Sequence, residues 1–282
     1  MPGYHLPYIA AAASGLFAEF DLDVELMEPA PGPENVRRVA EGGSDFCLTS
    51  VNHYLKARAA WGDLPARYTS VVVQRNPMCG IVAEDSKFTT PADLSAARVG
   101  GPPDSKLVAD YQAALVWLGH SPSELVPTDY GQAPAALKTG EIDAVPDYVD
   151  LLPRTRRQSG IDVRPVPFNL PLYSSGLVAG DHVSAELADR MGDAVAAALD
   201  AQRQDPEAGM DDLLRRYPDV DPAEALEGWS LAALNIFTGV PLGSMEADRW
   251  AATIEFAANA QSLPAPAPES VYRPDRAGLL VK

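Results

Sequence analysis

A chain of 282 residues is long enough to form two lobes, and its 46% hydrophobic and 22% charged content is that of an ordinary folded protein, which excludes a disordered one. With a net charge of -17 and no basic run beyond residues 154–157, the chain lacks the surface that neutralises phosphates, so we expect no nucleic-acid partner. No segment approaches the roughly 18 consecutive apolar residues of a membrane span, which excludes an integral membrane protein.

The cysteines and histidines show no metal-ligand spacing. Cys47 and Cys79 lie in apolar segments without a CxxC pattern, which favours buried free thiols over a zinc site or a disulfide. His120 and His182 stand alone in the sequence. We therefore expect neither a metal nor a cofactor.

The first 28 residues follow a loop, helix, strand pattern. Residues 4–7, with the sequence Tyr-His-Leu-Pro, are predicted to form a loop. Apolar residues then recur at helical spacing over residues 9–17, and residues 22–28 alternate apolar and acidic side chains at strand spacing.

The remaining chain alternates strands with helices. Further strands are predicted at residues 45–48, 68–74, 78–83, 97–100, 124–127, 140–145, 161–166 and 173–179. Further helices are predicted at residues 34–40, 51–60, 105–118, 132–138, 147–157, 184–203 and 206–217, and within 222–234 and 245–261. This alternation predicts an α/β protein with a mostly parallel sheet in each lobe.

The opening closely resembles that of the solute-binding proteins of ABC importers for nitrate, sulfonates and thiamine pyrimidines, and of their relatives, the hydroxymethylpyrimidine phosphate synthases. The resemblance rests on residues 4–7, on Gly15-Leu16-Phe17, on residues 22–28, and on Gly140-Glu141-Ile142-Asp143-Ala144. It covers most of residues 4–260 and implies a type II periplasmic-binding-protein fold. The first lobe would comprise residues 1–96 and 169–262, the second residues 97–168, and a proline-rich tail residues 263–282.

Members of that family carry a strand just before the opening loop, whereas only three residues precede Tyr4 here. We expect that upstream sequence, including this core strand, is missing. A signal or lipoprotein segment upstream would indicate an extracytoplasmic protein. An upstream strand with no such segment before it would indicate a cytoplasmic protein.

Ligands of open α/β sheets bind beyond the carboxyl ends of strands, where helix N-termini present free N–H groups. In a two-lobed protein these ends face the cleft. The residues that we expect at such positions are Tyr4, His5, Thr49, Ser50, His53, Asn76, Gly101, Ser105, Asp147, Tyr148, Tyr173 and Ser174.

Each candidate also has a structural interpretation. Tyr4 and His5 offer stacking and hydrogen bonding to a flat polar ligand, or they pack a loop. The hydroxyls at residues 49–50 either cap a helix or accept the polar edge of a ligand. The turn at residues 100–106 could bind an anion at a helix N-terminus or be a plain turn. Asp147 could pair with a ligand amino group or be a helix N-cap.

The resemblance implies a protein that binds a thiamine-type pyrimidine or a related heteroaromatic, less readily a sulfonate or nitrate, and delivers it to an ABC permease and its ATPase. The alternative is a cytoplasmic enzyme on the same scaffold, of the pyrimidine-precursor synthesis, desulfinase or decarboxylase type, with His5 and His53 as its acid/base pair. The synthase reaction itself is disfavoured. The cofactor-binding lysine of the synthases is replaced by Thr49, which cannot form a Schiff base, and the position of their cysteine cluster, residues 172–176, holds no cysteine.

Overall fold

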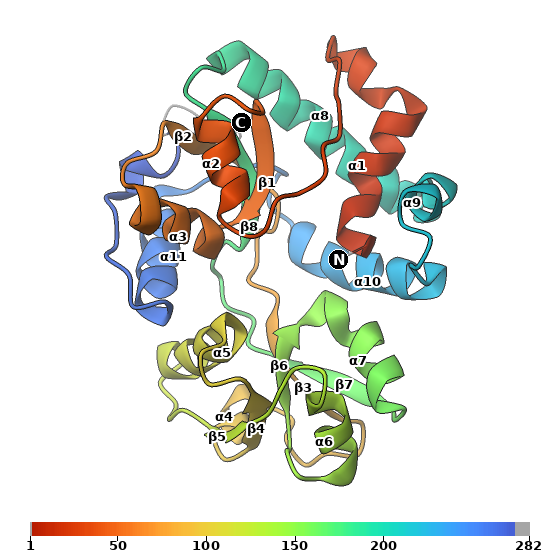
Figure 1. Ribbon diagram of the computed structural model, residues 1–282, viewed down its shortest axis with the longest axis vertical. Coiled ribbons are helices and arrows are strands. Elements are labelled where there is room, and N and C mark those ends of the chain that lie inside the picture. The colour runs from red at the N-terminus through yellow and green to blue at the C-terminus, as the bar shows by residue number, and fades with distance from the viewer. Residues whose placement is uncertain (1, 274–282) are drawn as a thin grey trace.

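The computed structural model describes residues 2–273, which form two lobes joined by two chain crossings (Figure 1). The upper lobe in Figure 1 contains both ends of the described chain, and the lower lobe is made from its middle third. The predicted proline-rich tail extends beyond residue 273, outside the described residues. Within residues 2–273, no helix is both long and apolar enough to cross a membrane.

The sheet of the first lobe is built around the strand that returns from the second lobe. Strand β8 (Ser175–Gly180) lies between β1 (Phe46–Ser50) and β2 (Ala66–Val71) and pairs antiparallel with both. At Gly176 a Cβ atom would lie 2.3 Å from the carbonyl oxygen of Ser70, so this close pairing needs glycine. The expectation of a mostly parallel sheet is therefore wrong for this lobe: β1 and β2 run parallel to each other, but the antiparallel β8 separates them.

The second lobe combines both kinds of pairing. Strand β3 (Met78–Ala83) pairs antiparallel with β6 (Val145–Tyr148) and β7 (Val163–Pro167), whereas β4 (Arg98–Gly101) and β5 (Glu124–Pro127) are parallel. A parallel bridge between Val99 and Ala144 connects the two groups of strands. The predicted parallel pairing is thus found between β4 and β5, which are connected through α5.

Helices cover both sheets, most of them close to their predicted positions (Figure 1). Their bounds are α1 Pro2–Ser14, α2 Glu34–Ala40, α3 Val51–Trp61, α4 Pro91–Leu94, α5 Lys106–Trp117, α6 Ala133–Thr139, α7 Leu152–Ser159, α8 Ala185–Gln204, α9 Met210–Arg216, α10 Pro222–Ile236 and α11 Ala247–Ala260. Short 3-10 turns are η1 Leu16–Phe20, η2 Val149–Leu151 and η3 Pro268–Ser270. The sequence predicts a helix at residues 147–157, but its first residues form the end of β6 and the turn η2, and α7 begins only at Leu152.

The opening segment differs from its prediction in two respects. Residues 4–7 are helical, because α1 begins at Pro2 and continues through Pro7. Pro7 lies inside the helix, past its first turn, where it cannot donate the hydrogen bond to the carbonyl of residue 3. Residues 22–28 form no strand, although Leu22 is buried and its acidic neighbours Asp23 and Glu25 are not. The side chains alternate as predicted, but no strand within residues 2–273 pairs with this segment.

The two lobes have separate cores. In the first lobe, Trp250 of α11 packs against Tyr68 and Tyr173, with ring centroids 4.9 and 5.2 Å apart. In the second lobe, Tyr111 of α5 meets Phe168 edge-to-face at 5.1 Å. Strand β3 and helix α4 belong to this second core. We therefore propose that the first crossing lies at residues 72–77, before the predicted boundary at residue 97; the return near residue 169 stays a prediction.

Candidate functional site

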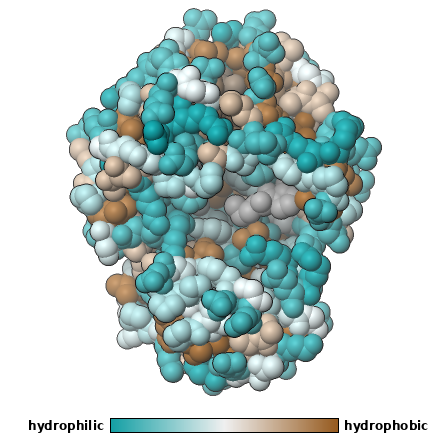
Figure 2. Space-filling model, viewed as in Figure 1, coloured by the Kyte–Doolittle hydropathy of each residue, from teal (hydrophilic) through white to brown (hydrophobic). Residues whose placement is uncertain are grey.

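A small cavity lies between the lobes, at the waist of the molecule (Figure 2). Its free volume is about 10 Å³, room for about one water molecule, so the two walls lie close together. Its walls come from both lobes and both crossings: Ser50, Val51, Asn52, Asn76, Tyr148, Tyr173, Ser174, Thr253, Phe256 and Ala257. Five of the twelve predicted site residues therefore meet here, and the hydroxyl, amide and aromatic groups around them suit a polar organic ligand.

Ser50 and Ser174 lie where strand ends meet. The Ser50 hydroxyl caps α3 by accepting a hydrogen bond from the backbone N–H of His53 at 3.3 Å. The next backbone N–H, that of Val51, donates to the carbonyl oxygen of Ser174 at 2.9 Å. The capping role predicted for this segment is thus present, and it holds the strand end against the return crossing. Thr49 is buried in β1 and does not line the cavity.

Tyr4 reaches the edge of this region from helix α1. Its hydroxyl lies 2.8 Å from the Ser175 hydroxyl, next to Ser174 in the chain. Burial raises the pKa of Tyr4 to about 12, so the phenol is neutral at physiological pH. Tyr4 thus supports the start of β8 and does not line the cavity itself.

The two histidines of the enzyme alternative lie in different surroundings. Burial lowers the pKa of His5 to about 4, and its charged neighbours include Glu28 and Arg216. Burial also lowers the pKa of His53 to about 4, with further lowering by Lys106 and Lys56. Both rings are neutral at pH 7. In the part of the chain that the structure describes, no hydrogen bond or ring contact joins them, and neither lines the cavity.

Gly101 and Asn76 both have structural roles in the second lobe and the first crossing. A Cβ atom at Gly101 would lie 2.5 Å from Cγ2 of Val108, so this glycine allows β4 to pack closely against α5. Asn76 lines the cavity, but its side-chain oxygen accepts a hydrogen bond from the N–H of Met78 at 2.9 Å. The amide nitrogen of Asn76 is the part of this side chain that can donate to a ligand.

The N-terminus of α5 carries a cation close to the cavity wall. Ser105 caps the helix, accepting from the N–H of Val108 at 3.3 Å, and its hydroxyl also contacts the Tyr130 hydroxyl. Lys106 donates from Nζ to the Tyr148 hydroxyl at 2.8 Å and to Asp110 at 2.9 Å. Although burial acts to lower the pKa of Lys106, Tyr148 and Asp110 outweigh it and raise that pKa. The lysine is therefore charged but already paired.

Two carboxyl groups of the second lobe, close to Tyr148 in the chain, are not among the residues that line the cavity. Asp147 is 3% exposed; it accepts from the backbone N–H of Tyr148 at 2.9 Å and lies 3.6 Å from Arg154. Burial raises the pKa of Asp147 to about 6, and it does the same for Asp150. Asp147 belongs to β6, so it is not the helix N-cap that the sequence allowed.

Sequence reasoning missed Asn52, Thr253 and Phe256 as cavity residues, and Asp110 behind the wall. Asn52 follows the predicted Ser50 by two residues, so its place at the same strand end was the available signal. Thr253 and Phe256 lie on a helix almost 200 residues further along, and no local pattern links them to the cleft. Within residues 2–273, no group of three or more His, Cys, Asp or Glu side chains could hold a metal ion.

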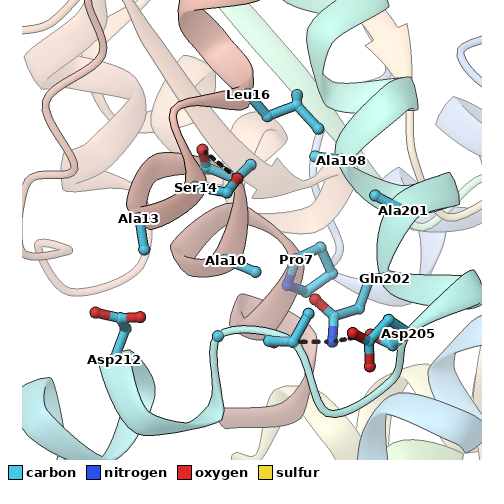
Figure 3. A pocket seen from close by; sticks show the side chains of 13 residues that line it. Pro7, Ala10, Ala13, Ser14, Leu16, Ala198, Ala201, Gln202, Asp205 and Asp212 are labelled. Atoms are coloured by element: carbon cyan, nitrogen blue, oxygen red, sulfur yellow. Dashed lines mark hydrogen bonds between the residues drawn. The ribbon is translucent and has the colours of Figure 1, made fainter.

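A larger groove of about 440 Å³ lies elsewhere, between α1, α8 and α9 (Figure 3). Alanines and Pro7 form most of its wall, and Asp205 and Asp212 lie at its edge. The side-chain amide nitrogen of Gln202 donates to backbone carbonyl oxygens, including that of Pro206 at 2.7 Å. None of the hydroxyl or aromatic groups predicted for the site lines this groove, so we place the candidate site at the waist.

The comparisons with known proteins agree with the two-lobed architecture. The family model described as "NMT1/THI5 like" matches residues 3–208. The periplasmic aliphatic sulphonate binding protein SsuA from Escherichia coli is 19% identical with a TM-score of 0.68, over 90% of this chain and 83% of that one. No curated protein matches the sequence.

Two further solved structures are similar over nearly the whole chain. The alkanesulfonate-binding protein SsuA from Xanthomonas axonopodis pv. citri, bound to MOPS, is 16% identical with a TM-score of 0.61, over 94% of each chain. The desulfurization enzyme DSZB is 15% identical with a TM-score of 0.57, over 94% of this chain and 92% of that one. At these identities the likeness concerns the fold, and it confirms the predicted two-lobed periplasmic-binding-protein fold.

Proposed function

We propose that this chain, which belongs to the NMT1/THI5-like family, binds a small organic solute between its two lobes and delivers it to an ABC importer. The observation that carries this proposal is the waist cavity, whose polar and aromatic walls come from both lobes and both crossings. A solute held there contacts both lobes at once, so its binding favours the arrangement in which they are close together.

The structural neighbours named for sulfonate binding support the same general role for this chain. In that role the protein acts outside the cytoplasm, and its partners are a membrane permease and an ATPase. Expression from the native gene together with the DNA upstream of the Met1 codon tests the location: after cell fractionation the protein should appear outside the cytoplasm. Its recovery in the cytoplasm alone would contradict this part of the proposal.

The residues that line the cavity are all uncharged, so among residues 2–273 its wall offers no unpaired cation to an anionic ligand. Lys106 behind the wall is already paired with Asp110, as Asp147 is with Arg154. The wall also contains the aromatic side chains of Tyr148, Tyr173 and Phe256, the kind of group that packs against a flat ring. We therefore infer a thiamine-type pyrimidine, or a related heteroaromatic with amino groups, in preference to a sulfonate or nitrate.

Calorimetric titration and thermal shift against hydroxymethylpyrimidine, an alkanesulfonate and nitrate test this order. A solute at one hundred times its dissociation constant should stabilise the protein by about 2.7 kcal/mol. We expect the pyrimidine to give the larger effect. A saturable response to the sulfonate alone would overturn the ligand class, and no saturable response to any solute would overturn the function.

A pair of variants locates the site. Tyr148→Ala removes an aromatic ring from the cavity wall, and we expect it to weaken binding of the responding solute at least tenfold. Trp61→Ala is the matched control, because Trp61 is an exposed aromatic residue at the end of α3, away from the cavity. Equal affinities of the two variants would place the solute elsewhere.

A further inference from the structure

The carboxylate of Asp110 lies between the lobes, where it accepts hydrogen bonds from three different segments. Asp110 belongs to α5 of the second lobe and is 2% exposed. Its Oδ2 accepts from Nδ2 of Asn52 at 2.7 Å and from Nζ of Lys106 at 2.9 Å, and its Oδ1 accepts from Nε2 of Gln261 at 2.6 Å. Asn52 lies on α3 of the first lobe, and Gln261 caps the end of α11.

The hydrogen bonds from Asn52 and Gln261 would be lost if the lobes separated, whereas the Lys106 bond lies within α5. Helix α11 packs against α3 of the first lobe and against α5 of the second. Its Trp250 and Ile254 belong to the core of the first lobe, and its Phe256 belongs to that of the second.

A carboxylate removed from water is stable only while it is paired and hydrogen-bonded, so loss of the Asn52 and Gln261 donors must be compensated by water. We call Asp110 and its donors Asn52, Lys106 and Gln261 the Asp110 cluster. Separation of the lobes would expose the buried charge of this cluster to water.

The same cluster extends to the cavity wall. Lys106 donates its second hydrogen bond to the Tyr148 hydroxyl at 2.8 Å, and both Tyr148 and Asn52 line the cavity. One of these two wall residues comes from each lobe. Through Asn52 directly and through Lys106 to Tyr148, Asp110 fixes the position of both.

We propose that Asp110 is a positioning residue that latches the two lobes together and sets the spacing between Asn52 and Tyr148 across the solute cavity. The assignment of the cavity to a solute rests on the proposed function, whereas the Asp110 contacts between the lobes can be tested without any solute. Two consequences are therefore measured separately: the distance between the lobes without ligand, and the affinity for solute.

The distance is measured by double electron-electron resonance between spin labels at exposed positions of the two lobes, Glu41→Cys and Lys138→Cys. The native thiols are unsuited to compete for the label, because burial raises the pKa of Cys47 to about 12 and raises that of the buried Cys79. In ligand-free protein we expect one dominant distance for the parent chain. Asp110→Asn should shift or broaden this distribution towards longer distances, because an amide cannot accept from all three donors.

Asp143→Asn is the matched control. Asp143 also pairs with a cation, Arg98 at 2.9 Å, but both partners lie within the second lobe, so the interlobe distance should not change. If Asp110→Asn does not fold, the interlobe distance is measured in Asn52→Ala instead. This variant removes one donor between the lobes and leaves the Lys106–Asp110 pair intact. Distance distributions of both variants that match the parent would overturn the latch.

Solute affinity provides the second readout, with hydroxymethylpyrimidine as the probe. Loss of the latch should weaken binding about tenfold, within the usual range of coupling between a conformational equilibrium and a ligand. Asp110→Glu should restore part of the affinity, because it keeps the charge. A longer interlobe distance with unchanged affinity would overturn the positioning role. Failure of the parent protein to bind any solute, with the distance change intact, would count against the proposed function only.

Discussion

The hydroxyl of Tyr4 lies 2.8 Å from the hydroxyl of Ser175, which connects the first helix of the chain to the first residue of the strand that returns from the second lobe. The two residues are 171 positions apart in the sequence. Ser175 is also the register partner of Ser50, the cap of α3. This single contact therefore joins α1 to the strand end that forms one wall of the cavity.

Tyr4→Phe should lower the free energy of unfolding by about 1 kcal/mol, because it leaves the Ser175 hydroxyl without this partner. Tyr217→Phe is the control: its hydroxyl makes a long contact of 3.4 Å with an exposed Glu28, so we expect a change below about 0.5 kcal/mol. Chemical denaturation of both variants measures the difference. Equal effects would show that the Tyr4 contact contributes nothing specific.

His53→Gln should reduce the loss of stability in acid. The pKa of His53 is lowered from 6.5 to about 4 in the folded protein, so the unfolded chain binds the additional proton between these values. Stability from this group is therefore complete above pH 6.5 and falls as the pH drops towards 4. Unfolding curves across this window should slope less for the variant, and an NMR titration midpoint of His53 near 6.5 would contradict the prediction.

Asp147→Asn should have the opposite pH signature. Burial raises the pKa of Asp147 from 3.8 to about 6, so the folded protein binds the additional proton and stability falls as the pH rises between these values. The variant should be more stable than the parent above pH 6, by at most about 3 kcal/mol, and similar to it below pH 3.8. Its lost pairing with Arg154 reduces the gain.

The control for Asp147 is the same substitution at Asp143, whose pKa is lowered mainly by its hydrogen bond with Arg98. Asp143→Asn should destabilise the protein at neutral pH by about 1 kcal/mol, since this pair is partly exposed. If both variants change stability in the same direction at pH 7, the ionised Asp147 does not carry the expected cost of burial.

Arg249→Met should loosen the two crossings. The guanidinium of Arg249 lies 4.2 Å from the ring centroid of Tyr173 and donates to the carbonyl oxygens of Gln74 and Pro171, one on each crossing. We expect faster amide hydrogen exchange at residues 72–77 and 168–174 and a loss of about 2 kcal/mol in stability.

The control for Arg249 is Arg37→Met. Arg37 is an exposed arginine whose ion pairs with Glu34 and Glu41 lie within its own helix and the residue that ends it, far from both crossings. It should leave both the hydrogen exchange of the crossings and the stability of the protein nearly unchanged. Unaltered exchange at the crossings in Arg249→Met would show that they are held by other contacts.

Local signals predicted most of the helices and five of the residues that line the cavity. Ser184 caps α8 as expected, and Ser50, Asn76, Tyr148, Tyr173 and Ser174 line one cavity because each lies at a strand end or a crossing. These positions follow from the order of strands along the chain, which the sequence pattern makes visible.

The rest depended on contacts between distant segments. In the sequence, Asp110 has the i,i+4 spacing from Lys106 that is typical of an exposed ion pair on a helix surface. Its other partners, Asn52 and Gln261, are 58 and 151 residues away and cannot be inferred from local spacing. Residues 22–28 have the alternation of a strand, but hydrogen bonding needs a neighbouring strand, which a pattern within one segment cannot guarantee. In both cases the outcome was decided by tertiary structure.

The central place of β8 also dictates an order of assembly. Because β1 and β2 reach one another only through β8, the sheet of the first lobe cannot close until the whole second lobe has left the ribosome. The second lobe is a continuous segment of the chain and can therefore form earlier. During synthesis β1 and β2 therefore expose unpaired edges, and this interval is when the nascent chain is most open to aggregation and to capture by chaperones.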